Sequence, residues 1–139
     1  MLRYKIIVQY DGTAFYGWQT QKSERTIQGE LELALKKIND SKNARVHGSG
    51  RTDAGVHAIG QVAHFDLKTS LDSFQLKDAL NGNLPPDIRI MKCNEVSKDF
   101  HARFSAIRRH YNYRIRTDGF ILDKNYTWNV DSIDKKILN

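Results

Sequence analysis

Apolar residues alternate with polar or smaller ones in several short stretches, a spacing that predicts half-buried β-strands. The first covers residues 4–10 and ends in an Asp-Gly-Thr turn, and a second covers 61–67. Residues 88–96 follow a Pro-Pro pair that stops further helix, and residues 110–116 alternate cleanly. A shorter candidate covers 44–47. The pattern thus predicts five strands.

A helical spacing of apolar residues separates these strands. Thr26 is an N-cap candidate for a helix whose apolar positions share one face: Ile27, Leu31, Ala34, Leu35 and Ile38. Asp72 with Gln75 resembles a capping box and opens a short helix through about Asn81. Asp131 can begin a further helix, which the end of the sequence at Asn139 interrupts. A helix that short is marginal by itself, so the end is either frayed or part of a longer protein.

The predicted order is strand, helix, strand, strand, helix, strand, strand. This order favours an α+β fold, in which helices pack on one face of a mainly antiparallel sheet, as in ferredoxin-like domains. The length of 139 residues corresponds to about one domain, and neither a repeat nor a Pro/Gly/Ser-rich linker divides it. From the pattern alone, we expect a single α+β layer.

Composition indicates a soluble globular protein, with 40% hydrophobic and 27% charged residues. The longest aliphatic run, at residues 6–8, is too short to span a bilayer, and no apolar segment follows the basic start. A single cysteine, Cys93, excludes an internal disulfide and a cysteine-based zinc site, and we expect it to be buried in a strand. We therefore expect a cytoplasmic protein without a membrane partner.

The charge is basic and unevenly distributed. Lys and Arg number 22 against 16 Asp and Glu, a formal charge of +6. No acidic residue lies between Asp99 and Asp118, where five arginines alternate with aromatic residues and histidines: Arg103, Arg108, Arg109, Arg114 and Arg116, with Phe100, Phe104, Tyr111 and Tyr113. Guanidinium groups pair with phosphates, and aromatic rings stack on unpaired bases, so this stretch suits RNA. A solvated basic strand with its aromatic residues in the core explains it equally well.

A glycine-rich loop at residues 48–55 is the strongest candidate for chemistry. It has neither the lysine of a P-loop nor the glycine spacing of a dinucleotide fingerprint, which argues against a phosphate-binding hydrolase. It does carry one carboxylate, Asp53, with Arg51 two positions earlier. An ionised carboxylate in a pocket can act as a nucleophile or a base. From the loop alone, an aspartate that caps its own turn is the simpler interpretation.

The histidines do not predict a metal site. His47, His57 and His64 could converge, but none has the helical spacing of a zinc motif, and no Cys or Glu completes a ligand set. We expect His57 to shape the glycine-rich loop and His64 to lie in a strand.

Seven blocks, in order, resemble the tRNA pseudouridine synthase A family at the spacings that the family shows. They cover almost the whole chain, from Tyr4 to about Arg116, and are far more specific together than singly: residues 10–19 (YDGTAFYGWQ), 26–28 (TIQ), 50–57 (GRTDAGVH), 60–65 (GQVAHF), 83–85 (NLP), 99–106 (DFHARFSA) and 109–113 (RHYNY).

The resemblance implies an isomerase that converts uridine to pseudouridine at positions 38, 39 and 40 of the tRNA anticodon arm. It implies no metal and no organic cofactor. It makes Asp53 the catalytic residue, Arg51 the side chain that holds the flipped nucleotide and pairs with the aspartate, and Tyr111 the ring that stacks on the target base. Arg103, Arg108 and Arg109 become candidates for contacts with the RNA backbone.

Members of this family are about twice as long, with two similar α+β halves around the active-site cleft, and are commonly homodimers. The resemblance therefore implies that residues 1–117 form the half with the catalytic aspartate and that residues 118–139 begin the second half. We expect this chain alone to be inactive or nearly so. The alternative is a non-catalytic RNA-binding module that uses the same sheet surface.

Overall fold

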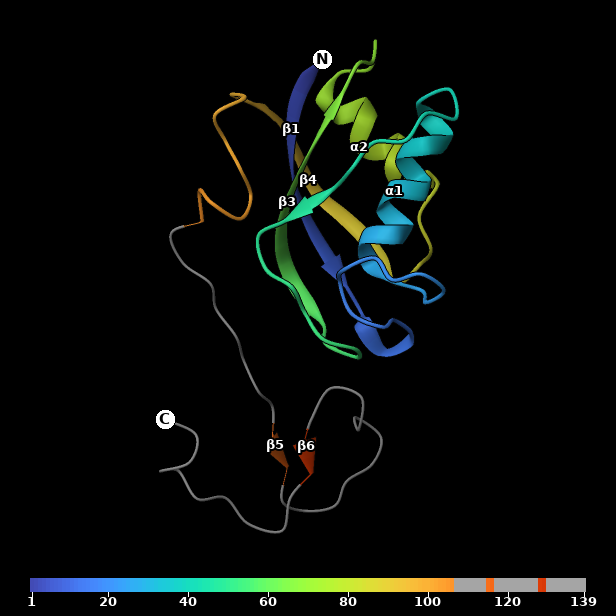
Figure 1. The fold of residues 1–139 in the computed structure, drawn as a ribbon, viewed down its shortest axis with the longest axis vertical. Coiled ribbons are helices and arrows are strands. Elements are labelled where there is room, and N and C mark those ends of the chain that lie inside the picture. Colours follow the sequence, from blue (N-terminus) through green and yellow to red (C-terminus); the bar gives the residue numbers. More distant parts are fainter. Residues whose placement is uncertain (107–114, 117–127, 130–139) are drawn as a thin grey trace. The chain divides into compact units, whose positions relative to one another are not determined.

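A computed structural model of the chain describes residues 1–106, 115–116 and 128–129 (Figure 1). Contacts divide the chain into two units, residues 1–108 and 109–139. Several predicted features lie outside the described residues: Arg108, Arg109, Tyr111, most of the strand at 110–116, the boundary after residue 117 and the helix after Asp131. These stay predictions.

The first unit contains a four-stranded antiparallel sheet in the order β2-β3-β1-β4. The central strand is the N-terminal one, which pairs with a long strand on each side, and a two-residue strand lies at one edge: β1 (Leu2–Tyr10), β2 (His47–Gly48), β3 (Ala58–Leu67) and β4 (Ile88–Val96). The α+β class and the mainly antiparallel sheet predicted from the sequence are confirmed. In the second unit, β5 (Ile115–Arg116) and β6 (Trp128–Asn129) form a parallel pair.

Two helices begin at the predicted caps. The hydroxyl of Thr26 accepts a hydrogen bond from the Gly29 amide at the start of α1 (Ile27–Ile38). Asp72 and Gln75 exchange both bonds of a capping box at the start of α2 (Ser73–Gly82). Both helices lie on the same side of the sheet (Figure 1).

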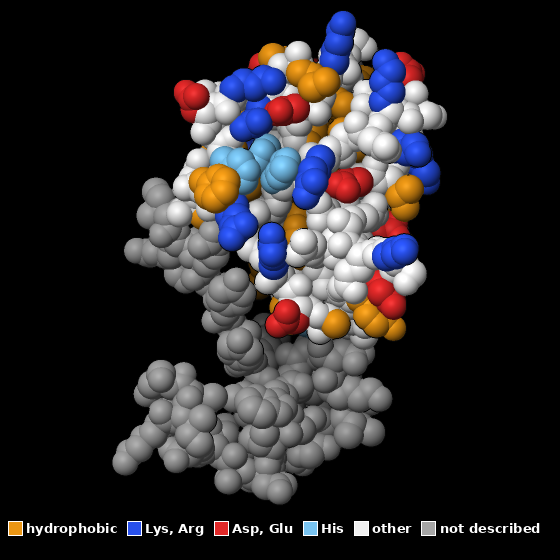
Figure 2. Space-filling view, in the orientation of Figure 1, with side chains coloured by type: hydrophobic (Ala, Val, Ile, Leu, Met, Phe, Trp, Pro, Cys, Tyr) orange, Lys and Arg blue, Asp and Glu red, His pale blue; other side chains and the backbone are white. Residues whose placement is uncertain are grey.

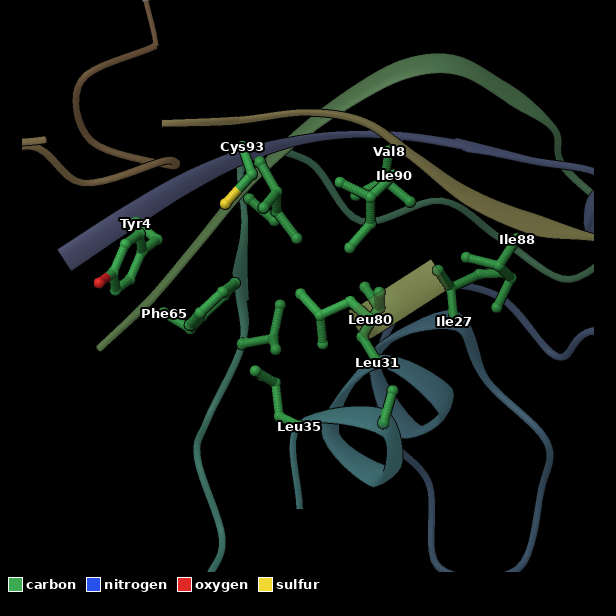
Figure 3. Packing of buried hydrophobic residues seen from close by; sticks show 14 of the residues in the cluster. Tyr4, Val8, Ile27, Leu31, Leu35, Phe65, Leu80, Ile88, Ile90 and Cys93 are labelled. Carbon is green, nitrogen blue, oxygen red and sulfur yellow. The ribbon is translucent and has the colours of Figure 1, made fainter. Parts of the chain in front are cut away.

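The core lies between these helices and the facing side of the sheet (Figure 3). Alternate residues of β1 and β3 point into it, as do residues of β4 on both sides of a register shift and one apolar face of each helix: Tyr4, Ile6, Val8 and Tyr10; Ala63, Phe65 and Leu67; Ile88, Ile90 and Cys93; Ile27, Leu31, Ala34, Leu35, Leu76 and Leu80. Each large side chain that is fully buried contributes roughly 1.5–3 kcal/mol. The alternation predicted for residues 4–10 and 61–67 is confirmed, whereas β4 departs from a period of two after Ile90.

The predicted strand at residues 44–47 is wrong in extent, because only His47 and Gly48 pair with β3. The reason is the buried Val46, whose backbone bonds to side chains of α1. Its carbonyl accepts a hydrogen bond from Gln28 Nε2 at 2.9 Å, and its amide donates to Glu32 Oε2 at 3.2 Å. Partial burial raises the pKa of Glu32. Such bonds between a helix and a loop leave no periodic signal in the sequence.

Among the described residues, no helix is long and apolar enough to cross a bilayer.

Candidate active-site loop

Asp53 lies in the loop that joins β2 to β3, and its side chain is exposed. The loop turns back directly after it, where the carbonyl of Asp53 accepts a hydrogen bond from the Val56 amide at 3.1 Å and Gly55 has a φ of +79°. The turn is therefore closed by the main chain of Asp53. This geometry leaves the carboxylate at the surface of the described unit, where a substrate can reach it.

The segment of residues 11–18, which follows β1, holds this loop in place. The amide of Trp18 donates to the carbonyl of Thr52 at 3.0 Å, and the amide of Gly55 donates to the carbonyl of Phe15 at 3.1 Å. The hydroxyls of Tyr10 and Thr52 lie 2.9 Å apart. Asp53 is thus fixed on both sides of its position in the chain.

Two glycines allow this close approach. A Cβ atom added to Gly17, which has a φ of +86°, would lie 2.6 Å from the carbonyl oxygen of Thr52. A Cβ atom added to Gly12 would overlap the carbonyl of Val56. Only glycine fits both positions without moving the Asp53 loop.

His57 ties the end of the loop to the same segment. Its Nδ1 accepts a hydrogen bond from the Gly12 amide at 2.9 Å and lies 3.2 Å from the Asp11 carboxylate. The expectation that His57 shapes the loop is confirmed. At the start of the loop, Gln61 donates from Nε2 to the carbonyl of Gly50 at 2.6 Å. Both ends of the loop are therefore anchored to the folded unit.

Arg51 lies on this loop with an exposed side chain. Within the described part of the chain, no ion pair joins it to Asp53. The pairing that the family resemblance implies stays a prediction. The positions of the two residues, separated only by the anchored Thr52, keep the guanidinium and the carboxylate on the same short segment.

The face of the sheet opposite the helices is partly covered by residues 97–106. Arg3 donates from Nη1 to the carbonyls of Lys98 and Phe100, at 2.9 and 2.7 Å, and also pairs with Asp66. His64, only 1% exposed, accepts a hydrogen bond at Nδ1 from the Ala102 amide at 3.0 Å. Burial, with Arg3 nearby, lowers the pKa of His64 to about 4, so its ring is neutral at pH 7. His64 lies in a strand, as predicted.

Three histidine rings gather on this face. His47 stacks on His64 with ring centroids 4.9 Å apart, and His101 contacts both rings, at 5.5 and 4.6 Å. Among the described residues, no group of three or more His, Cys, Asp or Glu side chains is arranged to hold a metal ion. His57, which the sequence allowed to converge with His47 and His64, bonds instead to the segment after β1. Arg103, the one described arginine among the backbone candidates, is exposed beside this group.

Residues 6–105 match the family model described as "tRNA pseudouridine synthase". The chain belongs to the tRNA pseudouridine synthase family. The matched range contains the second half of β1, both helices, β3, β4 and the complete Asp53 loop. The resemblance based on the seven sequence blocks is confirmed at the level of the family.

Curated relatives named "tRNA pseudouridine synthase A" are similar over most of this chain. The protein of Maridesulfovibrio salexigens is 47% identical over 137 residues, which are 96% of this chain and 50% of the relative. That of Afipia carboxidovorans is 47% identical over 94% of the chain and 54% of the relative. That of Geobacillus kaustophilus is 52% identical over 83% of the chain and 45% of the relative. The chain thus spans about half the length of these relatives.

Proposed function

We propose that this chain is the catalytic-aspartate half of an enzyme that isomerises uridine to pseudouridine in tRNA. The observation that carries the proposal is an exposed carboxylate, Asp53, on a loop that hydrogen bonds and two glycine contacts hold against the folded unit. A nucleophile works best when the scaffold fixes its position, because orientation lowers the entropic part of the barrier. Family membership supports tRNA as the substrate.

The isomerisation exchanges one bond to the ribose for another. The carboxylate of Asp53 attacks either the uracil or the ribose C1′, and the bond between N1 and C1′ breaks. The uracil rotates, C5 bonds to C1′, N1 takes up a proton and C5 loses one, so that the product is an isomer of the substrate. The carboxylate leaves unchanged, and the balance requires neither an oxidant nor a reductant. Arg51, two positions before Asp53 on the same anchored loop, is the proposed cation that pairs with the carboxylate.

The target base must leave the stack before it reaches Asp53, because the glycosidic bond is inaccessible inside a helix. In the proposed enzyme, Arg51 holds the flipped nucleotide and Tyr111 stacks on the uracil. Arg103, Arg108 and Arg109 contact the backbone of the anticodon arm, and uridines 38, 39 and 40 are the targets. These roles come from the family resemblance, and Tyr111, Arg108 and Arg109 lie outside the described residues.

In this proposal the active-site cleft lies between two halves of the protein, and its second side is formed by the half that this chain lacks. Relatives carry about twice as many residues, and only about half of each aligns with this chain. We propose that residues 1–117 and 118–139 belong to successive halves, that the complete enzyme is a cytoplasmic homodimer, and that this chain alone is inactive. Below, "complete enzyme" means this chain together with the remaining half found in its relatives.

Mapping pseudouridine in tRNA tests the function directly. An unmodified tRNA transcript with uridines at positions 38–40 is incubated with the chain, or with the complete enzyme, and pseudouridine is located by chemical labelling and primer extension. We expect modification at those positions by the complete enzyme and almost none by the chain alone. Tight tRNA binding by the complete enzyme without any pseudouridine would instead support the non-catalytic RNA-binding module.

A further inference from the structure

Residues 101–105 form a compact turn that closes on itself. The amide of Ser105 donates to the carbonyl of His101 at 2.7 Å, and the His101 amide donates to Ser105 Oγ at 2.9 Å. His101 Nδ1 accepts hydrogen bonds from the amides of Arg103 and Phe104, at 3.2 and 3.4 Å. The imidazole therefore organises the backbone that carries Phe104.

The turn is fixed to the open face of the sheet by groups that lie beneath it. Ala102 is 1% exposed, and its amide bonds to the buried His64. The His101 ring lies 4.6 Å from the His64 ring, edge to face. On this face of the molecule, histidine side chains lie together beside a hydrophobic side chain, with Lys and Arg around them (Figure 2). The turn is thus a rigid part of the surface.

Phe104 projects from this rigid turn with 78% of its surface exposed, whereas Phe65 and Phe15 are buried. One partner of the ring is His101, with ring centroids 4.4 Å apart and planes 35° from parallel. The guanidinium of Arg103 lies 5.7 Å from the centroid of the Phe104 ring. An exposed aromatic ring supported by an imidazole and accompanied by a guanidinium is a surface on which a flat, electron-rich ring can stack.

We propose that Phe104, with His101 behind it and Arg103 beside it, is a stacking site for an unpaired base of the bound RNA. This inference rests on the proposed function, because it assigns a base contact within the same tRNA complex, separate from Asp53. Base–aromatic stacking accepts any base, so the site contributes affinity and position more than sequence choice. Arg103 can pair with the adjacent phosphate or extend the stack.

The surrounding charge favours RNA over a protein as the occupant. Lys5 lies 5.5 Å from the ring centroid of Phe100, whose carbonyl accepts from Arg3, and Lys98 is exposed on the same segment. The centre of a protein–protein interface is depleted in charged residues, whereas an RNA surface needs cations around its stacking rings. Two acidic residues lie nearby: Asp66, which pairs with Arg3 and Lys98, and Asp99, which is exposed on the same segment.

The test compares tRNA affinities of the complete enzyme in an Asp53→Asn background, so that no substrate is converted during the measurement. We expect Phe104→Ala to weaken binding roughly 5- to 150-fold, the range for the loss of one stacked base. Phe104→Trp, which keeps an aromatic face, should have a tRNA affinity close to that of the parent. The matched control is Phe74→Ala: Phe74 is 68% exposed on α2 with Lys77 over its ring at 4.9 Å, and its loss should leave affinity unchanged.

Two results would overturn the proposal. One is that the Phe104→Ala variant binds tRNA as tightly as the parent or the Phe74→Ala control does. The other is a change in oligomeric state or in thermal unfolding with Phe104→Ala, which would mean that the ring packs against protein. Turnover by the enzyme with Asp53 intact is measured separately. A failure of the proposed function therefore appears as missing pseudouridine, and a failure of the stacking site as unchanged affinity.

Discussion

The hydroxyl of Tyr10 lies 2.9 Å from the hydroxyl of Thr52, and this contact joins the last residue of β1 to the residue directly before Asp53. The Tyr10 ring is buried beside Trp18, whose amide bonds to the carbonyl of Thr52. Thr52 is therefore held by its side chain and by its main chain. The hydroxyl of Tyr10 thus links the buried core of the sheet to the backbone that carries the proposed nucleophile.

Removing this hydroxyl should slow the reaction more than it weakens substrate binding. We expect Tyr10→Phe in the complete enzyme to lower kcat by about 10-fold or more with little change in KM, because small misplacements of a reacting group are costly. Thr52→Ser, which keeps a hydroxyl, should retain most of kcat, whereas Thr52→Val should resemble Tyr10→Phe. Steady-state kinetics on a tRNA transcript measures both constants.

Tyr4→Phe is the matched control, because Tyr4 is a second buried tyrosine on β1 whose ring packs on Phe65, far along the strand from the loop. It should leave kcat near the parent value. Equal losses of kcat for Tyr4→Phe and Tyr10→Phe would show a general effect on the core instead of a positioning role for Tyr10.

Gly17→Ala should destabilise the fold by about 1–3 kcal/mol, because it adds a Cβ atom at a positive φ and close to the Thr52 carbonyl. Gly82→Ala is the control: it lies at the end of α2, and a Cβ atom there meets nothing within 4 Å. That change should leave stability equal or slightly higher. Urea unfolding of the 139-residue chain gives both free energies. A Gly17→Ala chain as stable as the parent would contradict the close packing of the two loops.

Stability should fall as the pH is lowered from about 6.5 toward 4. Burial lowers the pKa of His64 to about 4, so the unfolded chain binds a proton in this range that the folded chain does not. Burial also lowers the pKa of His47, and this shift likewise makes the fold less stable as the pH falls. Asp66, whose pKa is lowered by its hydrogen bond with Arg3, stabilises the fold above its unfolded pKa, and that contribution is lost at still lower pH.

The expected loss between these two pH values is up to about 3 kcal/mol, measured by urea unfolding at a series of pH values. His64→Asn is the informative variant, since its amide oxygen can accept from the Ala102 amide without titrating. Its stability should vary less with pH over this range. The same slope in parent and variant would assign the effect to other groups.

Cys93 should resist thiol reagents in the native chain. It is 8% exposed in β4, and burial raises the pKa of its thiol to about 11, so little of the reactive thiolate is present at neutral pH. Ellman's reagent should therefore react with the native chain only as fast as the chain unfolds. In urea it should react at the ordinary rate of an exposed thiol. Immediate reaction of the native chain would place Cys93 at the surface.

The sequence predicts most helices and strands of the first unit because each depends on residues close together in the chain. The Thr26 cap, the Asp72–Gln75 box and the alternation of Ala63, Phe65 and Leu67 are all present as predicted. The loss of the strand at 44–46 could not be foreseen, because it depends on Gln28 and Glu32 reaching across from α1.

The same limit applies to the candidate site. Asp53 and Arg51 are candidates from the sequence blocks, and the role of His57 follows from its place beside the glycine-rich loop. Tyr10, Gly17 and Trp18 stand in a different block. Their contacts with Thr52 join positions more than thirty residues apart, and such long-range pairs leave no spacing that a single sequence can reveal. The family resemblance places both blocks in one protein, and the structure brings them together.

The most direct test of the central claim is to measure tritium release from tRNA labelled at uracil C5, with Asp53→Asn compared with the parent complete enzyme. Since the amide is isosteric with the carboxylate but a poor nucleophile, we expect no detectable release and a tRNA affinity within a few-fold of the parent. Release at the parental rate would contradict a nucleophilic role for Asp53. A parallel loss of tRNA binding would make the residue structural.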